Sequence, residues 1–255
     1  MRASTITDKI MKVLRLLLIT AFWVGVWQVV HLIIGRDIYV PSAFVVFDSL
    51  QDLVQTREFW EIVYASMVRV LIGVMISFLL GVSFGIIAGL NKWVYALFNP
   101  LMVVIKSTPV ISIIIVALVW FTSSNVPVFI SFLMCFPIIW TNTVTGIQNV
   151  DQKLLQMAKV YQVHRRDVFL KIYLPSLTPF MNAAMITALG LAWKVSVAAE
   201  VLSHPRKAIG SELYTSKAYL DSPTLFAWTL VVVMLSLIFE FVLARLVKKW
   251  SPYRR

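Results

Sequence analysis

Cysteine and charged residues are scarce in this sequence of 255 residues. The single cysteine, Cys135, excludes an internal disulfide and a cysteine metal cluster. Only 14% of the residues are charged, whereas soluble domains carry about a quarter. Among the charged residues, 12 are acidic and 23 are Lys or Arg, which leaves a net charge of +11. This composition argues against a soluble protein and leaves the basic excess to be explained.

Motifs that carry covalent chemistry are also missing. The sequence contains no GxxxxGK[ST] phosphate loop, no GxSxG and no HExxH. Its three histidines, His31, His164 and His204, are far apart in the chain, which argues against a histidine metal site. We therefore expect no catalytic, cofactor or metal site in this chain, and we do not expect it to be an enzyme.

Long hydrophobic runs dominate what is present. Hydrophobic residues make up 60% of the chain, and the mean hydropathy is +0.84. A bilayer core of about 30 Å requires about 20 apolar residues in a helix, and several windows of this length occur. The sequence therefore predicts an all-α polytopic membrane protein with six transmembrane helices, at about 11–34, 70–90, 100–121, 126–147, 179–201 and 224–247.

Local signals refine this outline. Pro41-Ser42 precedes an apolar pattern of helical spacing, which predicts a short amphipathic helix, and a second short helix is expected at 61–69. Asn91-Lys92 predicts a short turn before the third span, and a polar Lys-Ser-Thr-Pro stretch at 106–109 interrupts that span. Small residues of the second span fall on one face, where another helix can approach closely. These residues are Gly73, Ser77, Gly81, Gly85 and Gly89.

Basic residues are unevenly divided between the two sides of the predicted membrane. Six spans place both termini on one side, together with the turn at Lys92 and the long segment 148–177. That side collects fifteen of the 23 Lys and Arg, and the other side collects six. Lys and Arg concentrate in cytoplasmic loops, so we expect both termini and segment 148–177 in the cytoplasm. This asymmetry explains most of the net charge, and no nucleic-acid partner is expected.

Segment 148–177 is a long basic loop between two spans. Two short helices are expected in it, at about 152–161 and 166–173, joined near Gln162. The loop ends in Leu174-Pro175, which predicts a helix stop and re-entry into the membrane at a fixed angle. The first short helix carries an apolar stripe of Leu154, Leu155, Ala158 and Val160. Such a loop suits docking on a soluble partner, and binding of lipid headgroups is the alternative.

The loop resembles the coupling loop of ABC importer permeases. That pattern is Glu-Ala-Ala, a Gly four residues on, and Ile-x-Leu-Pro at the end. Ala158, Ile172, Leu174 and Pro175 match it, whereas Gln156, Met157 and Gln162 stand where Glu, Ala and Gly are usual. The missing Gly leaves the geometry of the turn at Gln162 an open question, because Gly adopts conformations that other residues avoid.

Other stretches, in matching order and spacing, resemble one branch of this family, which imports nitrate, sulfonates, taurine, bicarbonate and pyrimidine precursors. They are YVPSAFVVFDSL, SMVRVLIGVMISFLLGVSFGIIAGLN, FNPLMVVIKSTPVISIIIVALVWF and LGLAWKVSVAAEVL. The resemblance implies one transmembrane permease domain, 1–255, with the type I ABC importer permease fold in a bacterial inner membrane.

The resemblance also implies partners. A second permease copy would complete the pathway, and an extracytoplasmic solute-binding protein would contact segments 36–69 and 202–223. ABC ATPase subunits would bind loop 148–177 and would hold the ATP and Mg that this chain does not bind. Membrane lipid would surround the spans. The implied contacts to the ATPase are Gln156, Met157, Ala158, Gln162, Arg165, Ile172, Leu174 and Pro175.

Ionisable residues inside spans are costly and indicate function. Lys106, close to the break at Pro109, is either a cation of the pathway or a lysine that snorkels to the headgroups. Lys194 contacts an anionic solute, forms an internal ion pair or snorkels, and Glu200 is one candidate partner for it. Glu200 is also expected to structure a gate near the outer mouth, and Glu240 is expected to pair with a nearby base.

These features predict the transmembrane subunit of an ATP-driven importer for a small anionic or polar organic solute. The alternative is an ion-coupled secondary transporter, in which Lys106, Lys194 and Glu200 would be relay groups. A membrane scaffold without a transport role is a third reading. The importer depends on an ATPase in another chain, whereas the secondary transporter would work alone.

Overall fold

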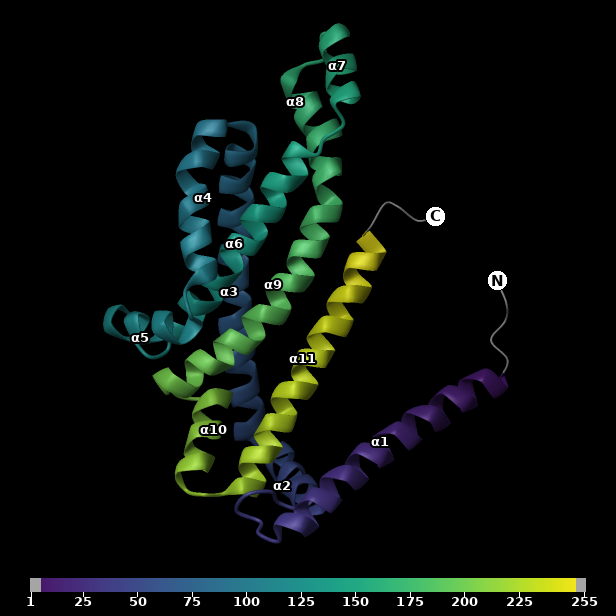
Figure 1. Cartoon of the computed structure of the whole chain (residues 1–255), viewed down its shortest axis with the longest axis vertical. Helices are drawn as coiled ribbons and strands as arrows, with labels where there is room; N and C mark the ends of the chain where they lie inside the picture. The colour runs from purple at the N-terminus through teal and green to yellow at the C-terminus, as the bar shows by residue number, and fades with distance from the viewer. Residues whose placement is uncertain (1–5, 251–255) are drawn as a thin grey trace. The chain divides into compact units, whose positions relative to one another are not determined.

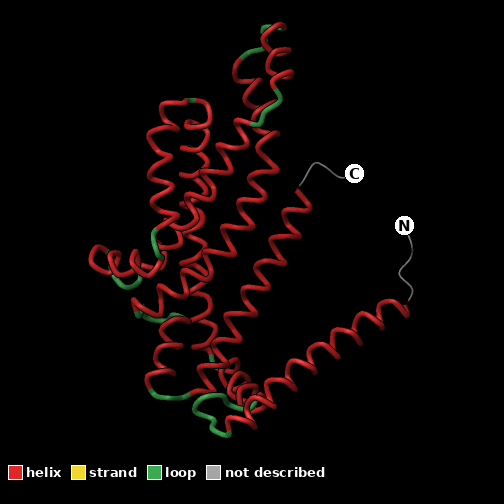
Figure 2. Tube along the Cα trace, in the orientation of Figure 1, coloured by secondary structure: helices red, strands yellow, loops and turns green. Residues whose placement is uncertain are grey.

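A computed structural model of the chain describes residues 6–250, and every regular element in this range is helical (Figure 2). Three of the basic residues counted for topology, Arg2, Arg254 and Arg255, lie outside the described residues. Within the described range the chain forms two compact units. The first contains residues up to 59 together with 212–231, and the second contains 60–211 together with the residues from 232 onward.

The first unit is built around α1 (Ile6–Ile34) and α2 (Ala43–Gln55). Ser42 caps α2, because its side chain accepts a hydrogen bond from the backbone N–H of Val45 at 3.3 Å, and the helix predicted after Pro41-Ser42 is thereby confirmed. The indole N–H of Trp27 donates to the carbonyl of Pro41 at 3.1 Å, which ties α1 to the start of this segment. The start of α11 (Ser222–Trp250) belongs to the same unit, and its Phe226 ring lies 5.8 Å from the ring of Trp27, centroid to centroid.

Most of the remaining helices belong to the second unit. They are α3 (Arg57–Leu90), α4 (Lys92–Ser107), α5 (Val110–Trp120), α6 (Val126–Gln148), α7 (Gln152–Val160), α8 (Arg165–Val168), the π-helical turn η1 (Phe169–Tyr173), α9 (Leu174–Ser203) and the start of α10 (Ile209–Ala218). Helices α6 and α9 lie side by side and form the centre of this unit (Figure 1). Helices α7 and α8 extend beyond them as a tip (Figure 1).

Five helices are long and apolar enough to cross a membrane, judged by length and composition, in the part of the chain that the structure describes. The third predicted span differs from the others, because α4 and α5 meet at 104° around Thr108-Pro109. If this bent pair is one broken span, the six predicted spans are present. The all-helical membrane fold is therefore confirmed, and the interruption seen in the sequence is a sharp bend.

Two boundaries were predicted wrongly. The third span does not begin at Pro100, because Asn91 accepts from the backbone N–H of Trp93 at 2.9 Å and caps α4, which starts eight residues earlier, at the predicted turn. The short helix expected at 61–69 is the first part of α3, which runs without a break from Arg57 to Leu90. Segment 202–223 contains a helix, α10, that no sequence pattern indicated.

The small-residue face predicted on α3 is confirmed, and α6 is the helix that approaches it. A methyl group added to Gly73, Gly85 or Gly89 would lie 2.6–2.7 Å from a side-chain carbon of α6. Within this contact, the hydroxyl of Ser77 donates a hydrogen bond to the carbonyl of Phe132 on α6 at 2.8 Å. The two backbones come this close because the glycines carry no side chain.

The core of the second unit lies on both sides of α6. One cluster joins α5, α6 and α9, and its fully buried members include Ile114, Ile130 and Ala199. The other joins α3, α4 and α6 around Trp140, whose ring stacks on Tyr95 with centroids 5.7 Å apart. Helix α6 is therefore held on both faces, and α9 keeps one face outside these clusters.

Candidate functional site

Helix α9 is continuous with the loop that precedes it, contrary to the predicted stop at Leu174-Pro175. The chain runs as one helical rod from Arg165 to Ser203. At η1 the backbone N–H of Leu174 bonds to the carbonyl of Phe169, five residues back. This wider turn accommodates Pro175, which has no N–H and whose ring would clash with a carbonyl in a regular turn. Pro175 therefore lies in the first turn of α9 and does not end the helix.

Helix α7 ends in a left-handed turn at Gln162. The N–H of Val163 bonds to the carbonyl of Ala158 at 2.9 Å, and the N–H of Gln162 bonds to that of Lys159 at 3.2 Å. These two bonds define a Schellman motif, in which the residue with positive φ is usually Gly. Gln162 takes this position with φ 50°. The turn joining the two loop helices, predicted near Gln162, is confirmed, and it forms here without the family's Gly.

The outward face of α7 differs from the predicted stripe. Ala158 is buried, with 3% of its surface exposed, and Leu155 is half-buried, so neither belongs to the outward face. The exposed apolar residues are instead Leu154, Met157, Val160 and Tyr161, at 41%, 50%, 77% and 77%. We call these four residues the α7 face. Three of them recur at spacings of three and four residues, which places them on one side of the helix.

The other predicted ATPase contacts lie along the rest of this loop. Gln156, Arg165, Leu174 and Pro175 are exposed, and Ile172 is half-buried. Asp167 and Lys171, one helical turn apart, form an exposed ion pair at 3.0 Å. A pair of this kind contributes about 0.3–0.5 kcal/mol, so it supports α8 only weakly.

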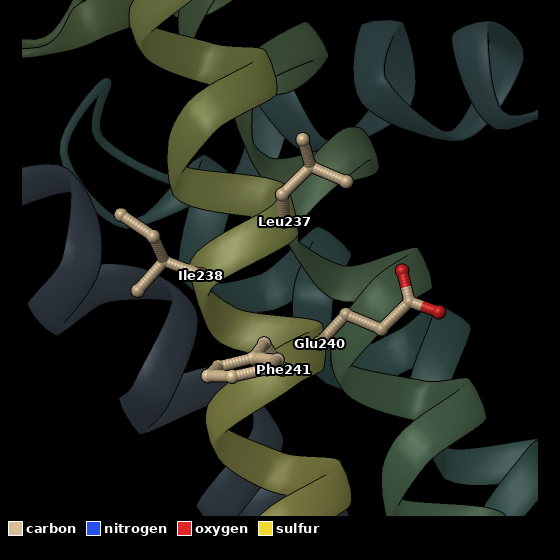
Figure 3. Close-up of a pocket in the computed structure, with 4 residues that line it drawn as sticks. All are labelled: Leu237, Ile238, Glu240 and Phe241. Carbon is tan, nitrogen blue, oxygen red and sulfur yellow. The ribbon is translucent and has the colours of Figure 1, made fainter. Parts of the chain in front are cut away.

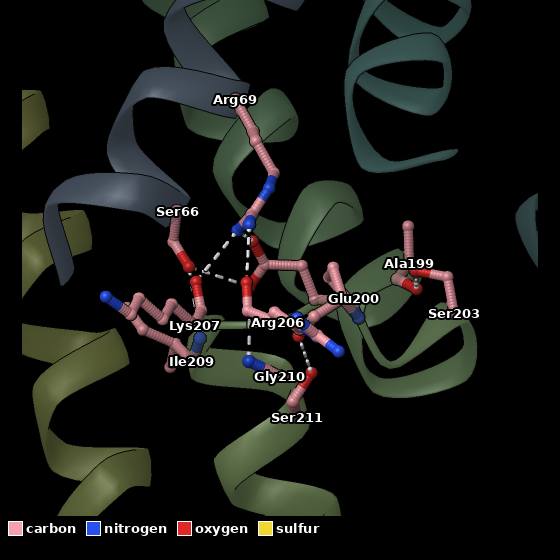
Figure 4. Close-up of polar contacts among 11 residues, drawn as sticks. Ser66, Arg69, Ala199, Glu200, Ser203, Arg206, Lys207, Ile209, Gly210 and Ser211 are labelled. Atoms are coloured by element: carbon pink, nitrogen blue, oxygen red, sulfur yellow. Dashed lines mark hydrogen bonds and ion pairs between the residues drawn. The ribbon is translucent and has the colours of Figure 1, made fainter. Parts of the chain in front are cut away.

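The far end of α9 carries a buried carboxylate. Glu200 has no exposed surface and accepts three hydrogen bonds, from Ser66 Oγ at 2.9 Å, Arg69 Nη1 at 3.0 Å and the backbone N–H of Gly210 at 3.1 Å (Figure 4). We call these four residues the Glu200 cluster. They join α3, α9 and the first turn of α10.

Arg69 and Ser66 extend the cluster to the backbone between α9 and α10. The guanidinium of Arg69 also donates to the carbonyls of Arg206 at 2.9 Å and Lys207 at 3.2 Å. Ser66 Oγ accepts from the N–H of Ile209 at 3.0 Å. The carboxylate is therefore charge-paired and fully bonded, which buried charge requires. Ser66 and Arg69 were not predicted, and nothing local in the sequence relates them to a residue more than 130 positions away.

Lys106 lies at the end of α4, immediately before the 104° bend. Its ammonium donates to Thr141 Oγ1 on α6 at 2.7 Å, and its side chain is otherwise exposed. Thr141 in turn donates to the carbonyl of Pro137 at 2.7 Å. Pro109, which the sequence also singled out, precedes the first residue of α5 and is exposed. Both residues therefore lie at an accessible break in the helix.

Lys194 is exposed on α9, between two buried neighbours. Trp193 points inward, where its indole N–H donates to the carbonyl of Val232 on α11 at 3.0 Å. Within the described part of the chain, Lys194 has neither a hydrogen bond nor an ion pair. Glu200 is occupied by its own cluster, so the ion pair considered between these two residues does not form.

Glu240 lies on α11 at an open hollow formed with Leu237, Ile238 and Phe241 (Figure 3). Its side chain is exposed, and the expected ion pair with a base is not found among the residues whose side chains the structure describes, which exclude Lys248 and Lys249. The nearby guanidinium of Arg245 lies over the ring of Phe241, 4.1 Å from the centroid. Among the described residues, the lining of the hollow comes from α11 alone and is apolar apart from Glu240.

The fold defines a class of protein, a polytopic helical membrane protein. A solved structure of the MetNI methionine ABC transporter, in an inward-facing conformation, matches with a TM-score of 0.63 and 13% identity. The match covers 74% of this chain and 96% of the other, which shows the type I ABC importer permease fold. Residues 81–252 match the family described as "Binding-protein-dependent transport system inner membrane component". The chain belongs to that family.

Curated relatives place the chain in the nitrate and sulfonate branch. The nitrate import permease protein NrtB of Leptolyngbya laminosa is 31% identical over 146 residues, which cover 57% of this chain and 52% of that relative. The putative aliphatic sulfonates transport permease protein SsuC of Escherichia coli is 27% identical over 90% of this chain and 89% of its own length. SsuC of Bacillus subtilis is 23% identical, with 92% and 86% covered.

Proposed function

We propose that this chain is the transmembrane subunit of an ATP-driven importer. An extracytoplasmic binding protein would deliver a small solute, and ABC ATPase subunits would bind and hydrolyse ATP with Mg. The observation that carries the proposal is the α7 face, an exposed apolar surface on a short helix in a basic loop. Family membership supports the same role, because the loop resembles the segment on which the ATPase docks in such permeases.

The continuous helix supplies a route for force. Arg165 to Ser203 spans 39 residues, or about 58 Å at ~1.5 Å per residue. Its first residues lie next to the α7 turn, and its last turn enters the Glu200 cluster. ATP-driven closure of two ATPases would pull the α7 helices of two permease copies together. The rod would pass this movement to the opposite side of the membrane, where α9 is bonded to α3 and α10.

The positive-inside pattern supports an orientation with both termini and loop 148–177 in the cytoplasm. Segments 36–69 and 202–223 would then face the binding protein. The proposed assembly contains a second copy of the permease, with the pathway between the copies. The printed names of the relatives include nitrate and aliphatic sulfonates, both anions, and this favours a small anionic solute over a neutral one.

The test replaces Met157 by glutamate and measures how much ATPase co-purifies with the permease in mild detergent. A carboxylate buried without a partner costs more than the ~1.4 kcal/mol that corresponds to a factor of ten, so recovery should fall at least about tenfold. The matched control is Tyr219→Glu, at a residue 81% exposed on the other predicted side, which should leave recovery unchanged.

Two results would contradict the proposal. One is equal ATPase recovery with wild type and Met157→Glu, together with equal ATP-dependent uptake in proteoliposomes. The other is uptake by the purified chain alone, driven by an ion gradient, which is the behaviour of a secondary transporter.

A further inference from the structure

We infer that Lys194 contacts the transported solute and selects for negative charge. This inference rests on the proposed importer function and names a residue that sets its substrate class. It is drawn from three features of α9, namely the depth of Lys194, its lack of a partner and the space around it.

The depth of Lys194 argues against snorkelling. Lys194 lies nine residues before Ser203, the end of α9, which is about 14 Å at ~1.5 Å per residue. Side chains in a helix lean toward its N-terminus, so the ammonium is directed away from this nearer end. An extended lysine reaches about 6 Å along bonds of ~1.5 Å, and Pro175 at the other end is about 28 Å away. The ammonium is therefore directed along α9 toward the middle of the helix, away from its nearer end.

The charge of Lys194 is not neutralised by the described residues of this chain. The carboxylate of Glu200 already accepts from Ser66, Arg69 and Gly210. Glu61 pairs with Lys207 at 2.7 Å. A lysine in a membrane span requires water, an anion or a carboxylate, since hydrocarbon offers its three N–H donors nothing. A water-filled pathway that carries an anion meets this requirement.

Space beside Lys194 is available for a solute. Gly190 and Ala198 lie one turn before and after it on the same side of α9. A methyl group added to Gly190 would meet no atom within 4 Å, so this side of the helix is open. The neighbours Trp193 and Val195 are buried, at 1% and 6%, and hold the opposite side against the protein. The ammonium is therefore the only charged group presented by this part of the helix.

Ammonium chemistry fits transient contact with an oxyanion. Lysine offers a compact charge with rotatable donors, whereas a bidentate arginine fork would hold the anion more firmly. A transport pathway needs contacts that admit the solute and then release it. One charge-assisted hydrogen bond satisfies both needs, and the same charge repels cations.

The first experiment uses the complete importer in proteoliposomes, with nitrate and ethanesulfonate as probes. Lys194→Met should reduce ATP-dependent uptake of a transported anion at least about tenfold, the scale of one lost charge-assisted hydrogen bond, and Lys194→Arg should retain most of it. The control Lys92→Met, at an exposed lysine beside the turn that starts α4, should leave uptake unchanged. ATPase recovery should be equal in all variants, which separates this inference from the proposed function.

The second experiment does not depend on knowing the solute. In the complete importer with Cys135→Ser, Lys194→Cys should react with both a sulfonate-bearing and a trimethylammonium-bearing methanethiosulfonate, because a pathway contains water. No reaction with either reagent means that Lys194 faces lipid, and this overturns the inference. It is also overturned if Lys194→Met transports the anion normally, or if the wild-type importer takes up neutral or cationic solutes and neither anion. Loss of ATPase binding or of all ATP-dependent uptake in the wild type would instead contradict the proposed function.

Discussion

Replacing Arg69 by methionine should be strongly destabilising, because it leaves the Glu200 carboxylate buried without a counter-charge. Arg69 donates to Glu200 and to the carbonyls of Arg206 and Lys207, and Glu200 has 0% of its surface exposed. Removing one partner of a buried ion pair costs about 3–5 kcal/mol. Unfolding of the purified permease by SDS in mixed micelles would measure this loss.

The double variant Arg69→Met/Glu200→Gln separates the charge from the packing. A glutamine at position 200 is neutral, and its carbonyl can still accept from Ser66 or Gly210, so the double variant should recover about 1–3 kcal/mol relative to Arg69→Met. The control is Lys207→Met, which removes an exposed ion pair worth about 0–1 kcal/mol. The reasoning fails if Arg69→Met costs no more than this control, or if the double variant is less stable than Arg69→Met.

Two further predictions concern a turn and a titrating group. Gln162→Gly should keep ATPase recovery and slow amide exchange in α7, because it removes the strain of a left-handed non-glycine residue, about 1–2 kcal/mol. The β-branched Gln162→Val should reduce ATPase recovery. Equal recovery for both variants would contradict the turn's role. Burial, with Glu58 nearby, raises the pKa of Glu212 above its ordinary 4.5. The folded state then favours the protonated acid, and it loses stability as pH rises from about 4.5 through the raised pKa. Glu212→Gln should therefore be more stable than wild type to SDS unfolding at pH 7 and equally stable near pH 4. A difference in stability that is the same at both pH values would contradict this prediction.

Local patterns predicted the parts of this fold that depend on local physics. Apolar windows located the spans, since a bilayer requires about 20 apolar residues in each. The glycine row from Gly73 to Gly89 predicted a close helix contact, because only the missing side chains permit one, although nothing in the row named α6 as the partner. The turn at Gln162 was predicted from the two short helices expected on either side of it, even though the Gly that is usual at such a turn is absent.

The features that escaped prediction depend on contacts between distant residues or on backbone adjustment. The Glu200 cluster joins residues more than 130 positions apart, and no single sequence relates Arg69 to Glu200. The Leu174-Pro175 pair reads as a stop, but the π-helical turn before it makes room for the proline and the helix continues. The break at Thr108-Pro109 was visible, but its angle of 104° depends on how α5 packs against α6 and α9.

The continuity of α9 with the preceding loop connects three features, namely the α7 face, Lys194 and the Glu200 cluster. A helix that stopped at Pro175 could bend there, and movement of the docking loop would be lost in the bend. In the structure the rod from Arg165 to Ser203 carries Lys194 and ends in the bonds of Glu200. A displacement of α7 would be passed along this rod toward Lys194 and the Glu200 cluster. The proposed importer therefore needs no separate linkage between ATP hydrolysis and the residue that we propose contacts the solute.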